Sequence, residues 1–319
     1  MTPPQRAAAL SPRASEILTS LYRHRLLSTR QIHVLHAPAC TGRGVRWVLA
    51  RLEEAGYVER VRVSGTRQTA AWFASRLGAE AVEGAGVAPR PYRVTPERAR
   101  GPLQAHTLAV NDVGIAFVDA ARRRGEDFDA SGWRHEATHP ISQGRKTELV
   151  IADAVLDYTV HEDDGEVFVC RFVELDRGTM SVRELEAKLV RYARLYHFNP
   201  NPGPGQAQPG GWRQSYPRFP KVMVVMCGLP APALRRRVHS LLELARRDPE
   251  LLSAPAELGI SFTTLEELGR RGPFAPIFWR PAGLDVAVDV LGRRCAATAE
   301  AASGRAGPHL LITAGGEGR

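Results

Sequence analysis

Lysine and cysteine are scarce in this chain of 319 residues, and long apolar runs are missing. Only Lys146, Lys188 and Lys221 are lysines, so arginine supplies nearly all of the positive charge. The four scattered cysteines are too few for a disulfide scaffold, and they lack the paired Cys-x-x-Cys spacing of a zinc site. No stretch reaches the roughly 20 apolar residues that span a bilayer. These absences argue against a disulfide-stapled, zinc-binding or membrane-spanning protein.

Two catalytic signatures and a targeting signal are also missing. No glycine-rich segment is followed by the Lys-Ser/Thr pair of a phosphate-cradling loop. The His-hydrophobe-His metal signature of many relaxases is absent as well. The first ten residues lack the long apolar core of a signal peptide, so we expect a cytoplasmic protein associated with the nucleoid.

The positive charge is concentrated in the first third of the chain. Lys plus Arg total 43 and Asp plus Glu total 34, a net of +9. Residues 1–100 carry 16 Arg, no Lys and seven acidic residues, whereas residues 101–319 carry 27 basic and 27 acidic residues. An excess of one sign confined to one segment favours a surface for a polyanion.

Composition and periodicity predict an α/β (α+β) protein of two domains. Proline and glycine cluster at three places, which read as a linker, an insertion and a tail. The predicted division is a first domain at 10–83, a linker at 84–102, a second domain at 103–285 with an insertion at 199–220, and a disordered tail at 293–319.

The first domain has the pattern of a winged helix-turn-helix. A helix over 14–25 is followed by a capping box at Ser28, which begins a short second helix. A third helix is expected over 43–55, where Gly56 ends it, and the alternating residues after it predict a hairpin over 58–74. His33 and His36 could suggest a metal pair, but the absence of further ligands favours ordinary residues of the second helix.

Duplex DNA is the partner that this module predicts, because the third helix of such modules enters the major groove and the wing contacts the backbone. Arginine would neutralise phosphates there. The alternative is a winged helix used only for protein contacts. The candidate DNA-binding residues are Arg43, Arg46 and Arg51 on the third helix and Arg60, Arg62 and Arg67 on the wing.

The second domain carries carboxylates inside apolar strands. Asp153 interrupts the apolar run 149–156, and the run 167–175 ends in Glu174-Leu175-Asp176. Glu174 and Asp176 are two residues apart, so on a strand they point to the same side. A carboxylate inside a buried strand is costly unless something compensates it.

These carboxylates suit Mg²⁺ or Mn²⁺, which prefer oxygen ligands. We expect Asp153 and Glu174 as ligands, Glu136 as a further ligand and Asp176 as a catalytic or metal-binding neighbour. The alternative is that the acids face solvent or form ion pairs. The candidate partners for such pairs are Arg171, Arg177 and Arg183.

A lysine on the next helix favours a functional site. Ser181 begins a capping box, and the helix 182–197 places Lys188 on the same face as Leu185 and Tyr192. That face is turned toward the sheet, so Lys188 could pair with Glu174 or stabilise a phosphoryl transition state.

The order helix, three strands, helix, strand, with Asp153 on one strand and Glu174 on the next, resembles the PD-(D/E)XK nuclease fold over about 103–230. Ala152 replaces the proline of that motif and Asp176 its lysine. In known variants of the fold the lysine moves to the following helix, as Lys188 does. The resemblance implies catalytic roles for Asp153, Glu174, Asp176 and Lys188, although the fold also includes inactive members.

The whole combination looks like the replication-relaxation family of actinobacterial plasmids and integrative elements. The residues that carry this resemblance are the winged helix, the run from His106 to Val113, Trp133 with Glu136, the run from Val173 to Thr179, and Lys188 to Tyr192. It implies a role in replication, relaxation or transfer of mobile DNA. Other replication or transfer proteins are the further partners it implies, with a homodimer left open.

Three functions compete at this point. The first is a metal-dependent endonuclease or nickase. The second is a non-enzymatic DNA-binding initiator accessory or transcriptional regulator on a degenerate nuclease fold, in which Asp176 and Lys188 form a structural ion pair. The third, a relaxase with Tyr192 or Tyr196 as nucleophile, is disfavoured because both tyrosines lie where core aromatics are expected.

Overall fold

The protein is a mixture of helices and two sheets, which confirms the predicted α/β class. The computed structural model describes residues 10–39, 41–63, 65, 69–89, 93–143, 146–198, 211–281 and 286–294. Arg67, residues 199–210 of the predicted insertion, and residues 295–319 of the predicted tail lie outside this description.

The N-terminal part contains the three helices and the hairpin that the sequence predicts. Its elements are α1 (Pro12–His24), β1 (Leu27–Ser28), α2 (Thr29–His36), α3 (Gly42–Glu54), β2 (Val58–Arg62) and β3 (Ala70–Ala74). The capping box is present, because the Ser28 hydroxyl accepts from Gln31 N at 3.2 Å and the Gln31 side chain accepts from Ser28 N at 2.9 Å. The short strand β1, which was not predicted, pairs with β3 and completes a sheet of order β1-β3-β2.

The region after the hairpin differs from the prediction. Helix α4 (Arg76–Gly84) was not predicted, and the predicted linker contains helix α5 (Pro96–Arg100). The Thr95 side chain caps α5, and the Gln104 side chain donates to the carbonyl oxygens of Arg62 and Ala99 at 3.0 and 2.8 Å. Part of the linker is therefore ordered by specific contacts.

A long helix, α6 (Gln104–Arg124), leads into a sheet of five strands. The strands are β4 (Trp133–Gln143), β5 (Lys146–Glu162), β6 (Gly165–Asp176), β7 (Lys221–Met226) and β8 (Ser261–Thr264), in that spatial order. β4, β5 and β6 pair antiparallel, whereas β7 and β8 continue parallel to β6. The long apolar runs of β6 and β7 fit strands that helices cover on both faces.

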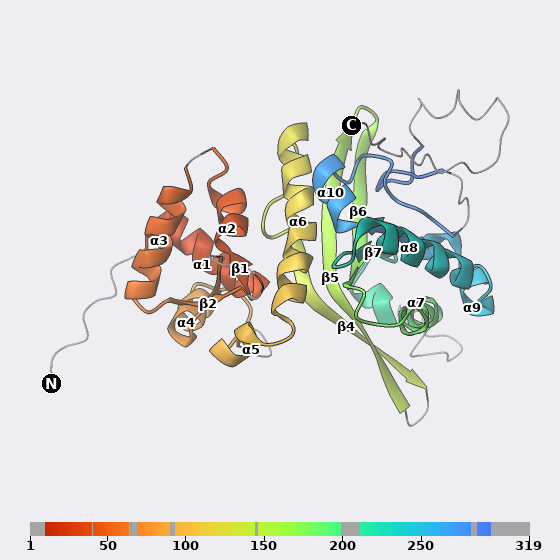
Figure 1. Ribbon diagram of the computed structural model, residues 1–319, viewed down its shortest axis with the longest axis horizontal. Helices are drawn as coiled ribbons and strands as arrows, with labels where there is room; N and C mark the ends of the chain where they lie inside the picture. Colours follow the sequence, from red (N-terminus) through yellow and green to blue (C-terminus); the bar gives the residue numbers. More distant parts are fainter. Residues whose placement is uncertain are drawn as a thin grey trace, which may run out of the picture.

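Helices lie on both faces of this sheet (Figure 1). α6 and α10 (Leu265–Arg271) lie on one face, and α7 (Val182–His197) and α8 (Ala231–Ala245) lie on the other, followed by α9 (Pro249–Leu252). The described end of the predicted insertion also packs on the second face, because Trp212, Tyr216 and Phe219 are buried in the same apolar cluster as α7 and α8.

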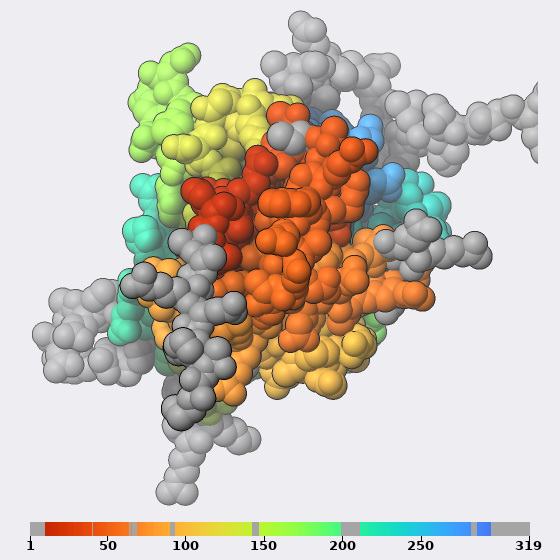
Figure 2. Space-filling view, turned by 90° about the vertical axis from the view of Figure 1, so that its left-hand side faces the viewer, coloured from red at the N-terminus to blue at the C-terminus, as the bar shows by residue number. Residues whose placement is uncertain are grey.

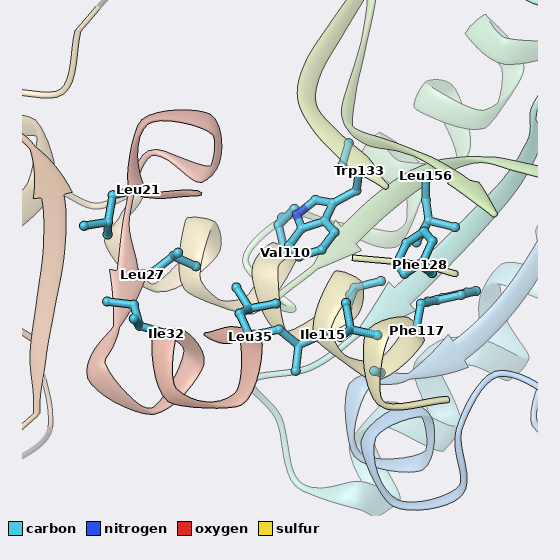
Figure 3. Packing of buried hydrophobic residues seen from close by; sticks show 14 of the residues in the cluster. Leu21, Leu27, Ile32, Leu35, Val110, Ile115, Phe117, Phe128, Trp133 and Leu156 are labelled. Carbon is cyan, nitrogen blue, oxygen red and sulfur yellow. The ribbon is translucent and has the colours of Figure 1, made fainter. Parts of the chain in front are cut away.

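One apolar core joins the N-terminal part to the first face of the sheet (Figure 3). Leu35 of α2 and Ile115 of α6 lie side by side in it, and Phe117 continues the contact toward Phe128 and the strands. Burial of apolar side chains on both sides of α6 stabilises the two parts as one body.

Asn111 of α6 is a buried polar link in this core. Its side-chain amide donates to the carbonyl oxygens of His24 at 3.2 Å and Leu26 at 2.8 Å. Its side-chain oxygen lies 3.3 Å from Trp133 Nε1 and 2.8 Å from His135 Nε2. Asn111 is fully buried, so it supplies the hydrogen bonds that water cannot make to these groups of the N-terminal part and of the sheet.

We expect Asn111→Ala to lower the free energy of unfolding by about 2–4 kcal/mol, because two carbonyl groups and two ring nitrogens would lose a buried partner. Chemical denaturation measures this loss. Arg123→Ala, on the exposed side of the same helix, is the matched control and should change stability by less than about 0.5 kcal/mol. Equal losses in the two variants would contradict the role of Asn111.

Candidate phosphodiester site

The candidate site lies where strands β5 and β6 separate. The two strands are paired as far as Ala154 and Val173, and beyond that point only the other edge of β6, which pairs with β7, continues the sheet. At the separation, Asp153 Oδ2 accepts from Leu175 N at 2.8 Å and so takes the place of a backbone carbonyl. Glu174 is the neighbour of Leu175 on β6, so the fork brings the two predicted carboxylates together.

Lys188 of α7 lies between these carboxylates. Its Nζ is 3.7 Å from Asp153 Oδ1 and forms an ion pair with Glu174 Oε2. The Ser181 capping box fixes the start of α7 and therefore the face on which Lys188 lies. The predicted convergence of Asp153, Glu174 and Lys188 is thus present in the structure.

Two further side chains complete the cluster. His106 of α6 places Nε2 at 3.3 Å from Asp153 Oδ1, and the buried Tyr192 hydroxyl donates to Glu174 Oε1. Two strands of the sheet and a helix from each covering layer therefore contribute to one charged cluster. His106 and Lys188 remain partly exposed, at 27% and 22% of their side chains, so the cluster is open to solvent on the side of Asp153.

The two carboxylates have opposite pKa shifts. Burial is the largest influence on Asp153 and raises its pKa, but the His106 hydrogen bond and the Lys188 charge outweigh it and hold the pKa below its usual value. Burial, with the Asp153 charge, raises the pKa of Glu174 to about 8 against the opposing effects of Lys188 and Tyr192. Two carboxyl groups driven apart in this way can hold different protonation states at neutral pH.

Lys188 is the cation that balances them. Burial lowers its pKa, but the Glu174 and Asp153 carboxylates together raise the pKa above its ordinary value. The ammonium is therefore kept charged at neutral pH. A charged group that ion pairs already hold in place is suited to stabilising charge that develops on a phosphate oxygen.

Two predicted ligands have other partners. Glu136 forms a bidentate pair with Arg25 at the end of α1, and both residues have positive φ, at 51° and 67°. Asp176 pairs with Arg237 of α8, 3.1 Å from its Nη2, and accepts from Gly178 N at 2.9 Å. Each of these two acids is thus engaged by an arginine from another element.

The carboxylates of Asp153 and Glu174 fit a magnesium site in which the protein supplies few of the ligands. Mg²⁺ is commonly held by one or two carboxylates, with waters and substrate phosphate oxygens filling its other positions. Asp153 and Glu174 supply such a pair. Within the described ranges, no group of three or more His, Cys, Asp and Glu side chains is placed to hold a metal ion, so a cation here would depend on water or phosphate ligands.

The candidate DNA-binding arginines fall into two groups. Arg43, Arg46 and Arg62 are exposed, and the described part of the chain gives them no carboxylate partner. Arg51 pairs with Glu54 at 2.9 Å, and Arg60 pairs with Glu53 at 3.0 Å. α3 lies on the side of the N-terminal part away from the large sheet, and Figure 2 shows that part filling the middle of this face.

A family model described as replication-relaxation matches residues 18–205, which is more than half of the sequence. The chain belongs to the replication-relaxation family. Membership supports a role in replication or relaxation of plasmid or other mobile DNA and confirms the family resemblance seen in the sequence.

Other comparisons give little beyond this family. The solved structure of protein VC1899 from Vibrio cholerae aligns at 13% identity with a TM-score of 0.31, over 83% of this chain. The alignment spans 56% of that chain, so this protein covers little more than half of its length. No curated protein matches the sequence. Among the described residues of this replication-relaxation protein, no helix is long and apolar enough to cross a membrane.

The sequence did not predict the contacts of His106 and Tyr192 with the cluster, or the exposure of Trp47. His106 was named only as part of the run that carries the family resemblance, and its contact with Asp153 depends on how α6 packs against the sheet. Tyr192 was expected in the core, and it is fully buried there, but its hydroxyl also bonds Glu174. Trp47 of α3 is 65% exposed beside Arg43 and Arg46, and its position in the helix was the only feature of the sequence that could have predicted this exposure.

The contacts of His36 bear on the alternative in which His33 and His36 form a metal pair. His36 Nε2 lies 3.0 Å from Ser20 Oγ, and burial lowers the pKa of His36 to about 4. A neutral, hydrogen-bonded histidine of α2 agrees with the structural interpretation of this residue.

We expect wild-type protein to lose stability relative to Glu174→Gln as the pH rises from about 5 to about 8. The ordinary pKa of 4.5 applies in the unfolded chain and the folded pKa is about 8, so the folded state binds more protons in this window. The difference should be on the order of 3 kcal/mol. Denaturation at several pH values measures it, with the exposed Glu148→Gln as control; parallel curves for wild type and Glu174→Gln would refute the shift.

Proposed function

We propose that this replication-relaxation protein binds duplex DNA through α3 and the β2–β3 hairpin and cleaves a phosphodiester bond at the cluster of Asp153, Glu174 and Lys188. The observation that carries the proposal is the meeting of these three side chains at the fork between β5 and β6. Two acids and a lysine from three separate elements are brought to one point that is open to solvent.

The DNA-binding part of the proposal rests on charge and exposure. Arg43 and Arg46 project from α3 without a carboxylate partner in the described chain, and Trp47 is exposed beside them. Thr41, at the start of α3, makes no side-chain cap hydrogen bond, so the first backbone N–H groups of this helix are free of a side-chain acceptor there. Arginine, free amides and an exposed aromatic ring are groups that contact phosphates and bases.

We expect Arg43→Ala with Arg46→Ala to weaken duplex binding about tenfold or more at moderate salt. Removing two phosphate contacts should also reduce the slope of log K against log salt by about 2. Fluorescence anisotropy with a labelled duplex over a salt series measures both quantities.

The matched control is Arg235→Ala with Arg236→Ala, which removes the same charge from the exposed side of α8. If this pair reduces affinity and salt slope as much as the α3 pair does, binding depends on net charge and the assignment of α3 fails.

The chemistry of the cluster follows from its charges. Asp153 and Glu174 would hold a divalent cation, which supplies activation of water and stabilisation of the leaving oxygen. Lys188 would orient and neutralise the phosphate, since its ammonium is already fixed between the acids. His106 and Leu175 N would hold the Asp153 carboxylate in position.

We expect Asp153→Asn, Glu174→Gln and Lys188→Met each to reduce Mg²⁺-dependent nicking of supercoiled plasmid by about 100-fold or more, because each removes a group that would hold the cation or neutralise the phosphate. Manganese binding, followed by electron paramagnetic resonance, should weaken in the two acid variants and persist in the lysine variant.

Glu148→Gln is the control for these variants, because it neutralises an exposed acid that pairs with Arg191 at 3.4 Å. Thermal unfolding shows that each variant is folded before activity is compared. Nicking by the Asp153 and Glu174 variants at the wild-type rate would remove the cluster from the reaction.

A second function, non-enzymatic DNA binding on a nuclease-like fold, is favoured by the internal contacts of the cluster. Both Glu174 oxygens and both Asp153 oxygens already have partners within the protein. The predicted third and fourth acids form ion pairs with Arg25 and Arg237. Sequence-specific binding without metal-dependent nicking, in protein with an intact cluster, would identify this function.

A further inference from the structure

Three cationic side chains gather on the α6 face of the sheet, which is opposite the face of Glu174. Arg171 of β6 is the register partner of Lys221 of β7, and Arg171 lies between residues that pack on the α6 face. Arg171 donates to the carbonyl oxygen of Val290. The Arg280 guanidinium lies against Gly292, where an added Cβ would be 2.2 Å from its Nη2, so the segment around 290–292 borders both arginines.

No carboxylate is paired with these cations anywhere in the described chain. Arg171 is 6% exposed, and its other recorded hydrogen bond is to the carbonyl oxygen of Cys170 at 2.9 Å. Arg280 Nε is buried without a hydrogen-bond partner. The acid that acts on Arg171 and Arg280 is Asp289, whose Oδ1 accepts from Arg293 N at 2.7 Å, and the acid that acts on Lys221 is Glu257, which forms no ion pair with it.

The three cations destabilise one another. Burial, with the charge of Arg280, lowers the pKa of Arg171 to about 10. Burial and the charges of Arg171 and Arg280 also lower the pKa of Lys221. A buried charge without a counter-ion destabilises the folded state, and an unsatisfied buried donor adds to that cost. A bound anion would relieve both penalties.

We propose that Arg171, Lys221 and Arg280 form a binding site for a phosphate group, separate from the candidate phosphodiester site. Arginine guanidinium groups match phosphate oxygens with paired N–H donors, and lysine adds a point charge. A phosphate carries the multiple negative charge that three cations require. Lys221 and Arg280 are only partly buried, so the anion would enter from their side, with Arg171 beneath.

The site is distinct because strand geometry separates it from Glu174. Arg171 and Glu174 are three residues apart on β6, so their side chains lie on opposite faces and roughly 10 Å apart along the strand. The proposal therefore does not depend on nuclease activity or on DNA binding by α3.

The first test is thermal unfolding of the full chain in sodium phosphate and sodium pyrophosphate, with sodium chloride keeping the ionic strength constant. A ligand that binds only the folded state raises the Tm in proportion to its concentration over Kd. We expect wild type to gain several degrees. Lys221→Gln with Arg280→Gln should lose the gain and bind pyrophosphate at least tenfold more weakly by calorimetry.

The control is Arg235→Gln with Arg236→Gln, which should keep the wild-type response. In the absence of phosphate, Lys221→Gln with Arg280→Gln should be at least as stable as wild type, because repulsion around Arg171 is removed. An unchanged phosphate response in this variant, or no response in wild type, would overturn the proposal. Equal stabilisation by citrate and phosphate would overturn the assignment to phosphate.

The source of the phosphate is decided by a second measurement. If a nucleotide or free phosphate is the ligand, calorimetry with ATP should show binding that Lys221→Gln with Arg280→Gln loses, while duplex affinity stays unchanged. If the DNA backbone is the ligand, the same variant should lower duplex affinity and the salt slope, as the α3 variant does. If only the α3 variant loses duplex affinity and no phosphate compound stabilises the wild type, this site is rejected, whereas the assignment of DNA binding to α3 stands.

Discussion

The rest of the structure depends on the buried face that α6 shares with both parts of the chain. Asn111 hydrogen-bonds the turn that follows α1 on one side and the first strand of the large sheet on the other. The apolar residues around it form one continuous core. The N-terminal part is therefore not a module on a flexible tether. A fragment that ended near residue 102 would leave the apolar surface around Leu35 without the cover that α6 provides.

The same packing determines what the fork can do. Strands β5 and β6 separate at Asp153, and the space between them admits side chains from a helix on each face. His106 comes from α6 and Lys188 from α7, so the two layers meet through the gap in the sheet. A regular ladder at this position would have placed backbone groups where the charged side chains now lie. The cluster is a product of the interruption in strand pairing.

The sequence predicts most of the fold because its signals are local. Capping boxes and helical periodicity identify α2 and α7, and the periodicity places Lys188 on the buried face. The partners of the acids are not local. Asp176 bonds Arg237, which is 61 residues away, and Glu136 bonds Arg25, which is 111 residues away. Strand spacing puts Asp176 on the same side as Glu174, but only the arrangement of α7 and α8 decides which helix each acid meets. The contact of His106 depends in the same way on tertiary packing.

Asp153 has two roles that depend on the same carboxylate. Its carboxylate belongs to the charged cluster, but it also satisfies the backbone amide of Leu175 where the ladder opens. A relative that had lost its chemistry would still need an acceptor at this position for the backbone amide of Leu175. Retention of the aspartate across a family would therefore report on architecture. The contacts among Glu174, Lys188 and Tyr192 satisfy no backbone amide at the fork. Their retention is therefore the better indication of an active site.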